Sequence, residues 1–145
     1  MRSKLLHESG GQKTYALIFE TGDEVISNLQ AFARSNRLGG SHFTAIGAFQ
    51  NATLGYFSWA KKEYQKIPVR EQVEVVSLVG DITEDESGGP KIHAHVVLGT
   101  STGTALGGHL LEAHVRPTLE VILVESPSHM QRRHDPETGL ALIKI

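Results

Sequence analysis

The segment KIHAHVVLGTSTGTALGGHLLEAHV, from Lys91 to Val115, predicts two neighbouring β-strands joined by a short turn. Alternation with a period of two is typical of a strand that buries one face. Such alternation is shown here by four apolar residues: Ile92, Ala94, Val96 and Leu98. Residues 101–104, which include Gly103, indicate the turn. A connection this short favours antiparallel neighbours, because parallel strands need a long crossover.

The sequence on either side predicts one long helix and several further strands. Residues 21–40 carry an apolar stripe at helical spacing, with Thr21 and Glu24 at capping-box spacing and Gly39–Gly40 as the stop signal. The other apolar runs are strand-sized, and we expect residues 41–60 and 105–126 to form two strands each. We therefore expect residues 1–145 to form one α+β domain. It should contain an antiparallel, curled sheet of about seven or eight strands and one main helix, with partial disorder in residues 1–12.

Four of the eight histidines lie in the Lys91–Val115 segment, and three of them suggest a metal site. His93 and His95 share the strand face opposite the apolar residues, about 6.6 Å apart along the strand. At that spacing, two imidazoles can converge on one ion with bonds of about 2.0–2.1 Å. The turn brings His109 back toward them, after a Gly107–Gly108 pair that allows close backbone approach. Three imidazoles would leave one side of the ion open, as in metal sites that bind ligands.

Alternatives to each of these assignments stay open at this stage. A His-x-His pair on a strand is also common at protein surfaces, and His114 is better explained by the end of a strand than by a fourth ligand. No catalytic residue is identified by a motif. Glu112 and Glu120 are weak candidates for a general acid or base beside the metal, and both are better explained as ordinary surface acids.

The composition excludes several classes of protein. There is no cysteine, so disulfides, thiolate chemistry and cysteine-ligated zinc are ruled out. The first twelve residues lack the apolar segment of a signal peptide, and no apolar run is long enough to span a membrane. These features favour a cytoplasmic protein that does not contact membranes. The 14 Lys and Arg against 16 Asp and Glu give a net charge of −2. The basic excess of a nucleic-acid-binding domain is thus absent, and the short cluster Arg132–His134 is interpreted as solvated loop charge.

Five segments in order resemble the plants-and-prokaryotes-conserved (PPC) domain, a family labelled "predicted DNA-binding": IGAFQNATLGYF, EVVSLVGDIT, HAHVVL, ALGGHLLEAHV and TLEVIL. The resemblance extends over Tyr15–Ile145. It implies an antiparallel sheet with one main helix, assembly as a homotrimer, and, as in prokaryotic members, a metal usually taken as zinc. When the family's metal ligands are carried over to this sequence, they correspond to His93, His95 and His109. The basic AT-hook that precedes the domain in plant relatives has no counterpart here.

Three functional hypotheses follow from these observations. The first is a trimeric PPC-domain protein with a histidine-ligated metal, Zn²⁺ or another divalent ion, that binds a small ligand or a protein partner. The second is a metal-dependent hydrolase or lyase, because zinc held by three histidines can lower the pKa of its bound water to about 7. The third is DNA binding, as the family label suggests, although the acidic balance and the missing AT-hook argue against tight binding.

Overall fold

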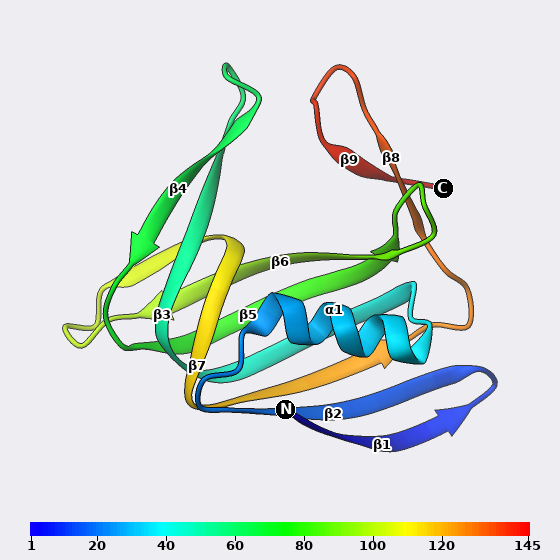
Figure 1. The fold of residues 1–145 in the computed structure, drawn as a ribbon, viewed down its shortest axis with the longest axis horizontal. Helices are drawn as coiled ribbons and strands as arrows, with labels where there is room; N and C mark the ends of the chain where they lie inside the picture. Colours follow the sequence, from blue (N-terminus) through cyan, green and yellow to red (C-terminus); the bar gives the residue numbers. More distant parts are fainter.

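The computed structural model describes residues 1–145 and contains one helix and nine strands. The elements are β1 (Arg2–Ser9), β2 (Gln12–Glu20), α1 (Val25–Asn36), β3 (Gly40–Ser58), β4 (Glu63–Val69), β5 (Val73–Glu84), β6 (Pro90–Gly99), β7 (Ala105–Glu125), β8 (Gln131–His134) and β9 (Ala141–Lys144). All nine strands belong to one sheet, which is antiparallel except for a single parallel pairing of β5 with β8 (Figure 1). The α+β class is confirmed, but the expected seven or eight strands are nine.

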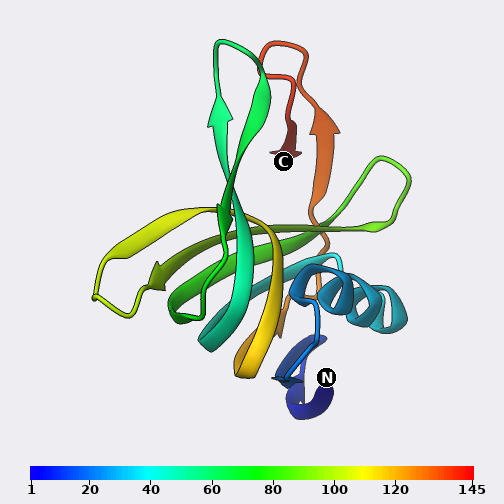
Figure 2. The ribbon, with the colours of Figure 1, turned by 60° about the vertical axis from the view of Figure 1, so that its left-hand side comes forward.

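The strand count differs because some predicted strands merge and others were missed. Residues 41–60 and 105–126, each expected to form two strands, become the single long strands β3 and β7, which pair with each other. Register irregularities interrupt that pairing at several points, and such bulges let long strands bend without breaking. At one of them, a side chain on Gly47 would come within 2.8 Å of Leu119 Cα, so the bend requires glycine. The curled sheet expected from the sequence is produced by these bends (Figure 2).

The helix occupies the expected region but begins later than Thr21. Glu24 caps it, because its carboxylate accepts hydrogen bonds from the backbone N–H groups of Ile26 (3.1 Å) and Ser27 (2.6 Å). The helix ends before the glycine pair, at Arg37 in the left-handed conformation. Gly39 and Gly40 instead lead into β3. One face of α1 packs on the sheet, and the core of 27 buried residues includes Leu29 and Phe32 from this face.

Residues 2–9, expected to be partly disordered, form β1 and pair with β2. Every side chain of β1 is exposed, so the strand has no apolar periodicity for a sequence pattern to detect. Its order comes from backbone pairing across a tight turn at Gly10 and Gly11, both at positive φ. The terminal ammonium of Met1 also lies 2.8 Å from the Asp23 carboxylate.

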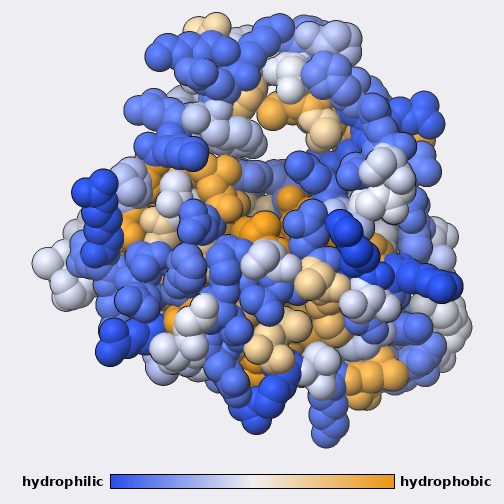
Figure 3. All heavy atoms as spheres, in the orientation of Figure 1, coloured by the Kyte–Doolittle hydropathy of each residue, from blue (hydrophilic) through white to orange (hydrophobic).

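Two hairpins, β3–β4 and β8–β9, rise from the same side of the sheet above β6 (Figures 1 and 2). Their tips meet, since Lys62 Nζ lies 3.5 Å from the Pro136 carbonyl oxygen and the Lys62 side chain packs beside Gly139. The space-filling view shows an opening through the molecule beneath these tips (Figure 3). We call this arrangement the hairpin arch. No helix in the structure has the length and apolar character needed to cross a membrane.

Candidate metal centre

His93, His95 and His109 converge beneath the hairpin arch. His93 and His95 lie on β6, and His109 lies on β7 directly opposite His95 in the strand register. One ring nitrogen from each of the three lies within 4.8 Å of the others. The closest pair is Nε2 of His93 and Nε2 of His95, which are 3.2 Å apart. The structure therefore brings together the three histidines that strand alternation and the intervening turn had placed near one another.

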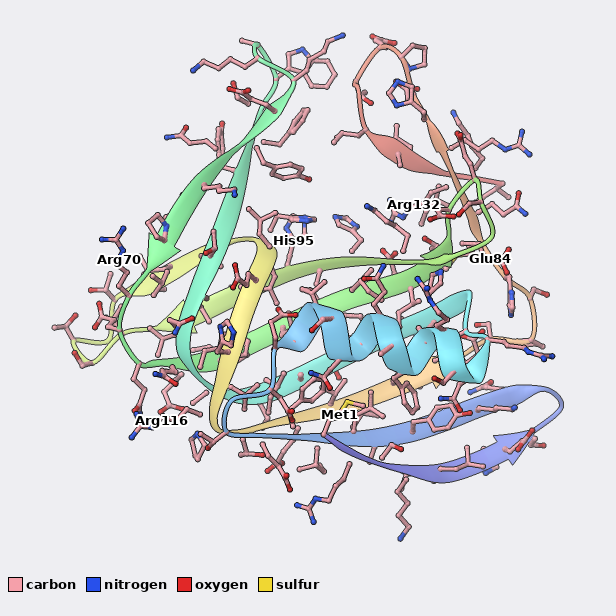
Figure 4. The ribbon with its side chains drawn as sticks, viewed as in Figure 1. Met1, Arg70, Glu84, His95, Arg116 and Arg132 are labelled. Atoms are coloured by element: carbon pink, nitrogen blue, oxygen red, sulfur yellow. The ribbon has the colours of Figure 1, made fainter.

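The alternation of β6 explains why the imidazoles point away from the core. Ala94, Val96 and Leu98 are buried as expected, and Ile92 is partly buried against the same core. The histidines between them must then take the outer face of the sheet. Figure 4 shows His95 on the side of β6 that faces away from α1, in the space between the two hairpins. The β6–β7 pairing completes the cluster from the neighbouring strand.

Two of the three imidazoles are held in the neutral form. Burial, followed by repulsion from positive charge on His93, His95, Lys91 and Arg132, lowers the pKa of His109 to about 4. Burial, followed by repulsion from His93, also lowers the pKa of His95. In addition, Nδ1 of His109 is buried and has no hydrogen-bond partner. Neutral imidazoles offer the lone pairs that a metal ion requires, so this donor set fits Zn²⁺ or a similar divalent ion.

Asp81 of β5 orients His93 from behind. It pairs with His93 in the strand register, and its Oδ2 lies 3.4 Å from His93 Nδ1. Burial alone would raise the pKa of Asp81, but hydrogen bonds from His93 and Arg132 outweigh it and hold the pKa below its usual value. If Nε2 of His93 is to bind a metal, Nδ1 must carry the proton and donate it to Asp81. Such carboxylate–histidine pairs fix the ring and raise the basicity of its other nitrogen.

Arg132 of β8 lies beside Asp81 and His93. The segment Arg132–His134 was interpreted from the sequence as solvated loop charge, and the burial of Arg132 corrects this for that residue. The side chain is only 8% exposed. Its Nε donates to Thr83 Oγ1 (3.0 Å), and one terminal nitrogen donates to both Asp81 oxygens (2.9 and 3.1 Å). The same nitrogen lies 3.2 Å from His93 Nδ1. Guanidinium groups only donate, so that contact is no hydrogen bond when Nδ1 is protonated toward Asp81.

A pocket of about 240 Å³ lies against the histidine cluster. The β8–β9 hairpin forms one wall of it, and residues of β4, β6 and β7 form the others. Tyr64 of β4 stacks obliquely on His109, with ring centroids 4.7 Å apart. The lining residues are Tyr64, Lys91, Ile92, His93, His109, Arg132, Gly139, Leu140, Ala141 and Leu142. Sequence reasoning identified only the two histidines of this set.

The other candidate residues lie outside the pocket. Glu112 is exposed and lies 4.0 Å from His114 Nδ1, while that nitrogen is 3.2 Å from Asn51 Oδ1. His114 is thus not part of the cluster. Glu120 lines a separate shallow depression on the outer face of the sheet. Neither acid is among the residues that surround the three imidazoles, and their role as a general acid or base stays a prediction.

The family model of the Plants and Prokaryotes Conserved (PCC) domain matches residues 6–127. The chain belongs to this family. The match begins earlier and ends earlier than the resemblance over Tyr15–Ile145 had implied, so β8 and β9 lie beyond it. No functionally curated protein matches the chain.

Solved structures from several organisms share the fold over nearly its whole length. A plant- and prokaryote-conserved protein of Pyrococcus horikoshii is 31% identical, with a TM-score of 0.85 over 96% of this chain and 98% of that one. A metal-containing protein of Archaeoglobus fulgidus is 33% identical, with a TM-score of 0.85 over the whole of both chains. A protein of Ralstonia eutropha described as a candidate for DNA binding is 30% identical, with a TM-score of 0.84 over 90% of each.

Proposed function

We propose that this PPC-domain protein holds a divalent metal ion, Zn²⁺ in the first instance, on His93, His95 and His109. The observation that carries the proposal is the convergence of three ring nitrogens within 4.8 Å, two of them on rings that stay neutral near pH 7. Asp81 supports the arrangement from behind His93. The metal-containing relative of Archaeoglobus fulgidus has the same fold at 33% identity.

The biochemical role that we propose is the binding of a small ligand or partner in the adjacent pocket. When bound, zinc supplies a Lewis acid that attracts oxygen and nitrogen atoms of a ligand. The chain's own residues then position that ligand, since Tyr64, Lys91 and the β8–β9 hairpin surround the space beside the cluster. A hydrolase or lyase would also need a general acid or base there, and both Glu112 and Glu120 lie elsewhere.

We also propose that the protein assembles with itself, as a homotrimer, through the outer face of the sheet. Five aliphatic side chains on this face are between 41% and 61% exposed: Ile46, Val76, Val79, Val97 and Ile122. Two shallow depressions on this face share Val79, which makes the apolar surface continuous from β7 to β6. Contiguous apolar surface of this kind marks protein interaction sites. His95 lies at the edge of this surface, so self-association and the metal site adjoin each other.

DNA binding is the second candidate, favoured by the description of the Ralstonia eutropha relative. The charge distribution of this chain argues against tight binding, because its net charge is −2 and Arg132 is buried against Asp81 rather than available to phosphates. A DNA-binding role predicts that the protein retards a duplex in a gel at low salt and releases it steeply as salt rises. We expect no salt-dependent retardation.

Elemental analysis of untagged protein, purified without chelator or nickel resin, tests the metal site. We expect about one metal ion per chain, and none in the double variant His93→Ala, His95→Ala. His7→Ala, in the exposed strand β1 at the far edge of the sheet, is the matched control and should keep its metal. An absence of metal in the natural protein, even after incubation with zinc, would refute the site.

Light scattering on the same samples tests the assembly. We expect the mass of a trimer for the natural protein. The variant Val79→Asp should shift the mass toward that of a single chain, because it places a charge in the middle of the apolar surface. A monomeric mass for the natural protein would refute the homotrimer and leave the outer face without an assigned partner.

A further inference from the structure

The pocket beside the histidine cluster carries a lysine that forms no salt bridge. Lys91 precedes His93 by two residues on β6, so the two side chains share the outer face of the strand. Lys91 lines the pocket, and its charge also helps to lower the pKa of Asp85 on its far side. Its ammonium group makes this end of the pocket electropositive.

The acidic residues nearby already have other partners. Asp81 accepts two hydrogen bonds from Arg132 besides its contact with His93, so its charge is offset by the buried guanidinium. On the far side of Lys91, Asp85 accepts from the backbone N–H groups of Ser87 (2.8 Å) and Gly89 (2.9 Å), and Glu86 accepts from that of His134 (2.8 Å). No carboxylate lines the 240 Å³ pocket itself. Electrostatics in this pocket therefore favour a ligand with negative charge.

The other walls of the pocket are apolar, and the pocket itself is small. Leu140 and Leu142 come from the β8–β9 hairpin, and Ile92 and Tyr64 come from β6 and β4. A volume of about 240 Å³ is below the roughly 300–1,000 Å³ of pockets for drug-sized ligands. The hairpin also lies beyond residues 6–127, the part of the chain that the family model describes. The wall that sets the shape of the pocket thus belongs to a segment beyond the part of the chain that the family model matches.

We propose that the pocket binds a small monocarboxylate with a compact apolar group. Its carboxylate faces Lys91 and the histidine cluster, and its apolar part lies against Leu140 and Leu142. The inference rests on the proposed function only where the metal would also bind the ligand's carboxylate. Lys91 and the two leucines would contact the ligand whether or not a metal is present. This ligand class follows from three features of the pocket. Lys91 forms no salt bridge, no carboxylate lines the pocket, and the β8–β9 wall is apolar.

Benzoate and benzamide test this proposal, since they have the same size and shape but only benzoate carries a charge. Binding is measured by nuclear magnetic resonance titration of zinc-loaded and of metal-free protein, and the metal content of each sample is determined by elemental analysis. We expect benzoate to bind about tenfold more tightly than benzamide and to shift the signals of Leu140 and Leu142. Lys91→Gln should remove most of that preference in both samples. Lys4→Gln, which removes the same charge from exposed β1, should retain it.

The outcomes separate this inference from the proposed metal site. Metal bound at one ion per chain, with benzoate and benzamide bound equally or not at all, would overturn the inference and leave the metal site intact. A protein that takes up no zinc on loading but still prefers benzoate through Lys91 would support the inference and refute the metal site. A preference for benzoate that survives Lys91→Gln, or that shifts no signal of Leu140 or Leu142, would also overturn the inference.

Discussion

The molecule holds two clusters of titratable side chains, one with three histidines and one with a single histidine, and their ring nitrogens have opposite surroundings. In the first, His93, His95 and His109 turn ring nitrogens toward one another, and Asp81 lies behind His93. In the second, His129 lies between two acids, with Nδ1 2.7 Å from Glu84 Oε1 and Nε2 3.3 Å from Glu125 Oε1. Both ring nitrogens of His129 therefore face a carboxylate, and neither belongs to a group of side chains that could hold a metal ion.

The second cluster is structural. Glu125 is buried at the end of β7 and accepts hydrogen bonds from the backbone N–H groups of Gly39 (3.0 Å) and Gly40 (3.3 Å) and from the Ser41 hydroxyl. His129 places one ring nitrogen beside Glu84 and the other beside Glu125, which ties the segment before β8 to β5 and β7. The two clusters differ in the position of their carboxylates. Acids beside both nitrogens of His129 hold that ring in the fold, whereas an acid behind one ring of the first cluster leaves the other nitrogen of that ring facing its neighbours.

The largest effect that separates the clusters should come from His109→Ala. With zinc at about 100 times its dissociation constant, we expect the free energy of unfolding of the natural protein to rise by about 2.7 kcal/mol. His109→Ala should abolish that rise, because it removes one of three ligands. His129→Ala should retain it in full. Denaturant unfolding with and without zinc measures both, and an equal loss of the zinc effect in the two variants would contradict the assignment.

A smaller effect is expected from Asp81→Asn, which keeps the shape of the side chain but weakens its hold on the His93 Nδ1 proton. Changes of this kind behind a metal ligand typically lower metal affinity by about 10–100-fold. Competition with a chelator indicator measures the change. Asp85→Asn is the matched control, because Asp85 accepts hydrogen bonds from the backbone N–H groups of Ser87 and Gly89 rather than from a histidine. Equal affinities in the natural protein and Asp81→Asn would show that the carboxylate plays no part in the site.

The histidine cluster could be predicted from the sequence because its geometry is local. Alternation along β6 decides which face His93 and His95 share, and one short turn decides that His109 returns beside them. Asp81 was also within reach, since the Gly88–Gly89 turn joins β5 to β6 and places Asp81 opposite His93. The residues of the turn alone do not set the register of that hairpin, so the sequence does not single out Asp81.

The rest of the pocket depends on contacts that no local pattern encodes. The short, polar strand β8 is joined to β5 by a single parallel pairing, yet it carries Arg132 into the structure. A sequence Gln-Arg-Arg-His has no apolar periodicity, so it resembles solvated loop charge until its partners Thr83 and Asp81 are known. Tyr64 likewise meets His109 only because β3 is long enough to carry β4 over the cluster.

The contribution of His129 to stability gives a third, smaller test. His129→Ala removes the 2.7 Å contact between Nδ1 and Glu84 Oε1 but leaves the three donors to buried Glu125 in place. We expect the free energy of unfolding of the metal-free protein to fall by about 1 kcal/mol, the typical net contribution of one hydrogen bond. His109→Ala should cost the metal-free protein less, because the Nδ1 that it removes has no partner. The reverse order, measured by urea unfolding, would contradict the structural role of His129.

The smallest effect concerns Glu24, an acid that caps the helix far from both clusters. Burial would raise its pKa, but hydrogen bonds from Ser27, Ile26 and Ala113 outweigh burial and lower the pKa below 4.5. A carboxyl with a lowered pKa in the folded state stabilises the fold above the unfolded value, and this contribution is lost as pH falls through the folded value. Glu24→Gln keeps an acceptor but removes the charge. It should cost about 0.5 kcal/mol at pH 7, and the difference from the natural protein should shrink between pH 5 and pH 3, about one unit either side of the normal glutamate value.

Glu71→Gln is the matched control for that experiment, because Glu71 is exposed and forms no salt bridge. It removes the same charge without touching a helix end, so its unfolding curve should follow that of the natural protein at every pH. A difference between Glu24→Gln and the natural protein that grows as the pH falls would mean that the carboxylate destabilises the helix end. Because the capping acid acts through backbone N–H groups alone, it neither gains nor loses from the metal. The pH effect should therefore be the same with and without zinc, unlike any change that involves the histidines of β6 and β7.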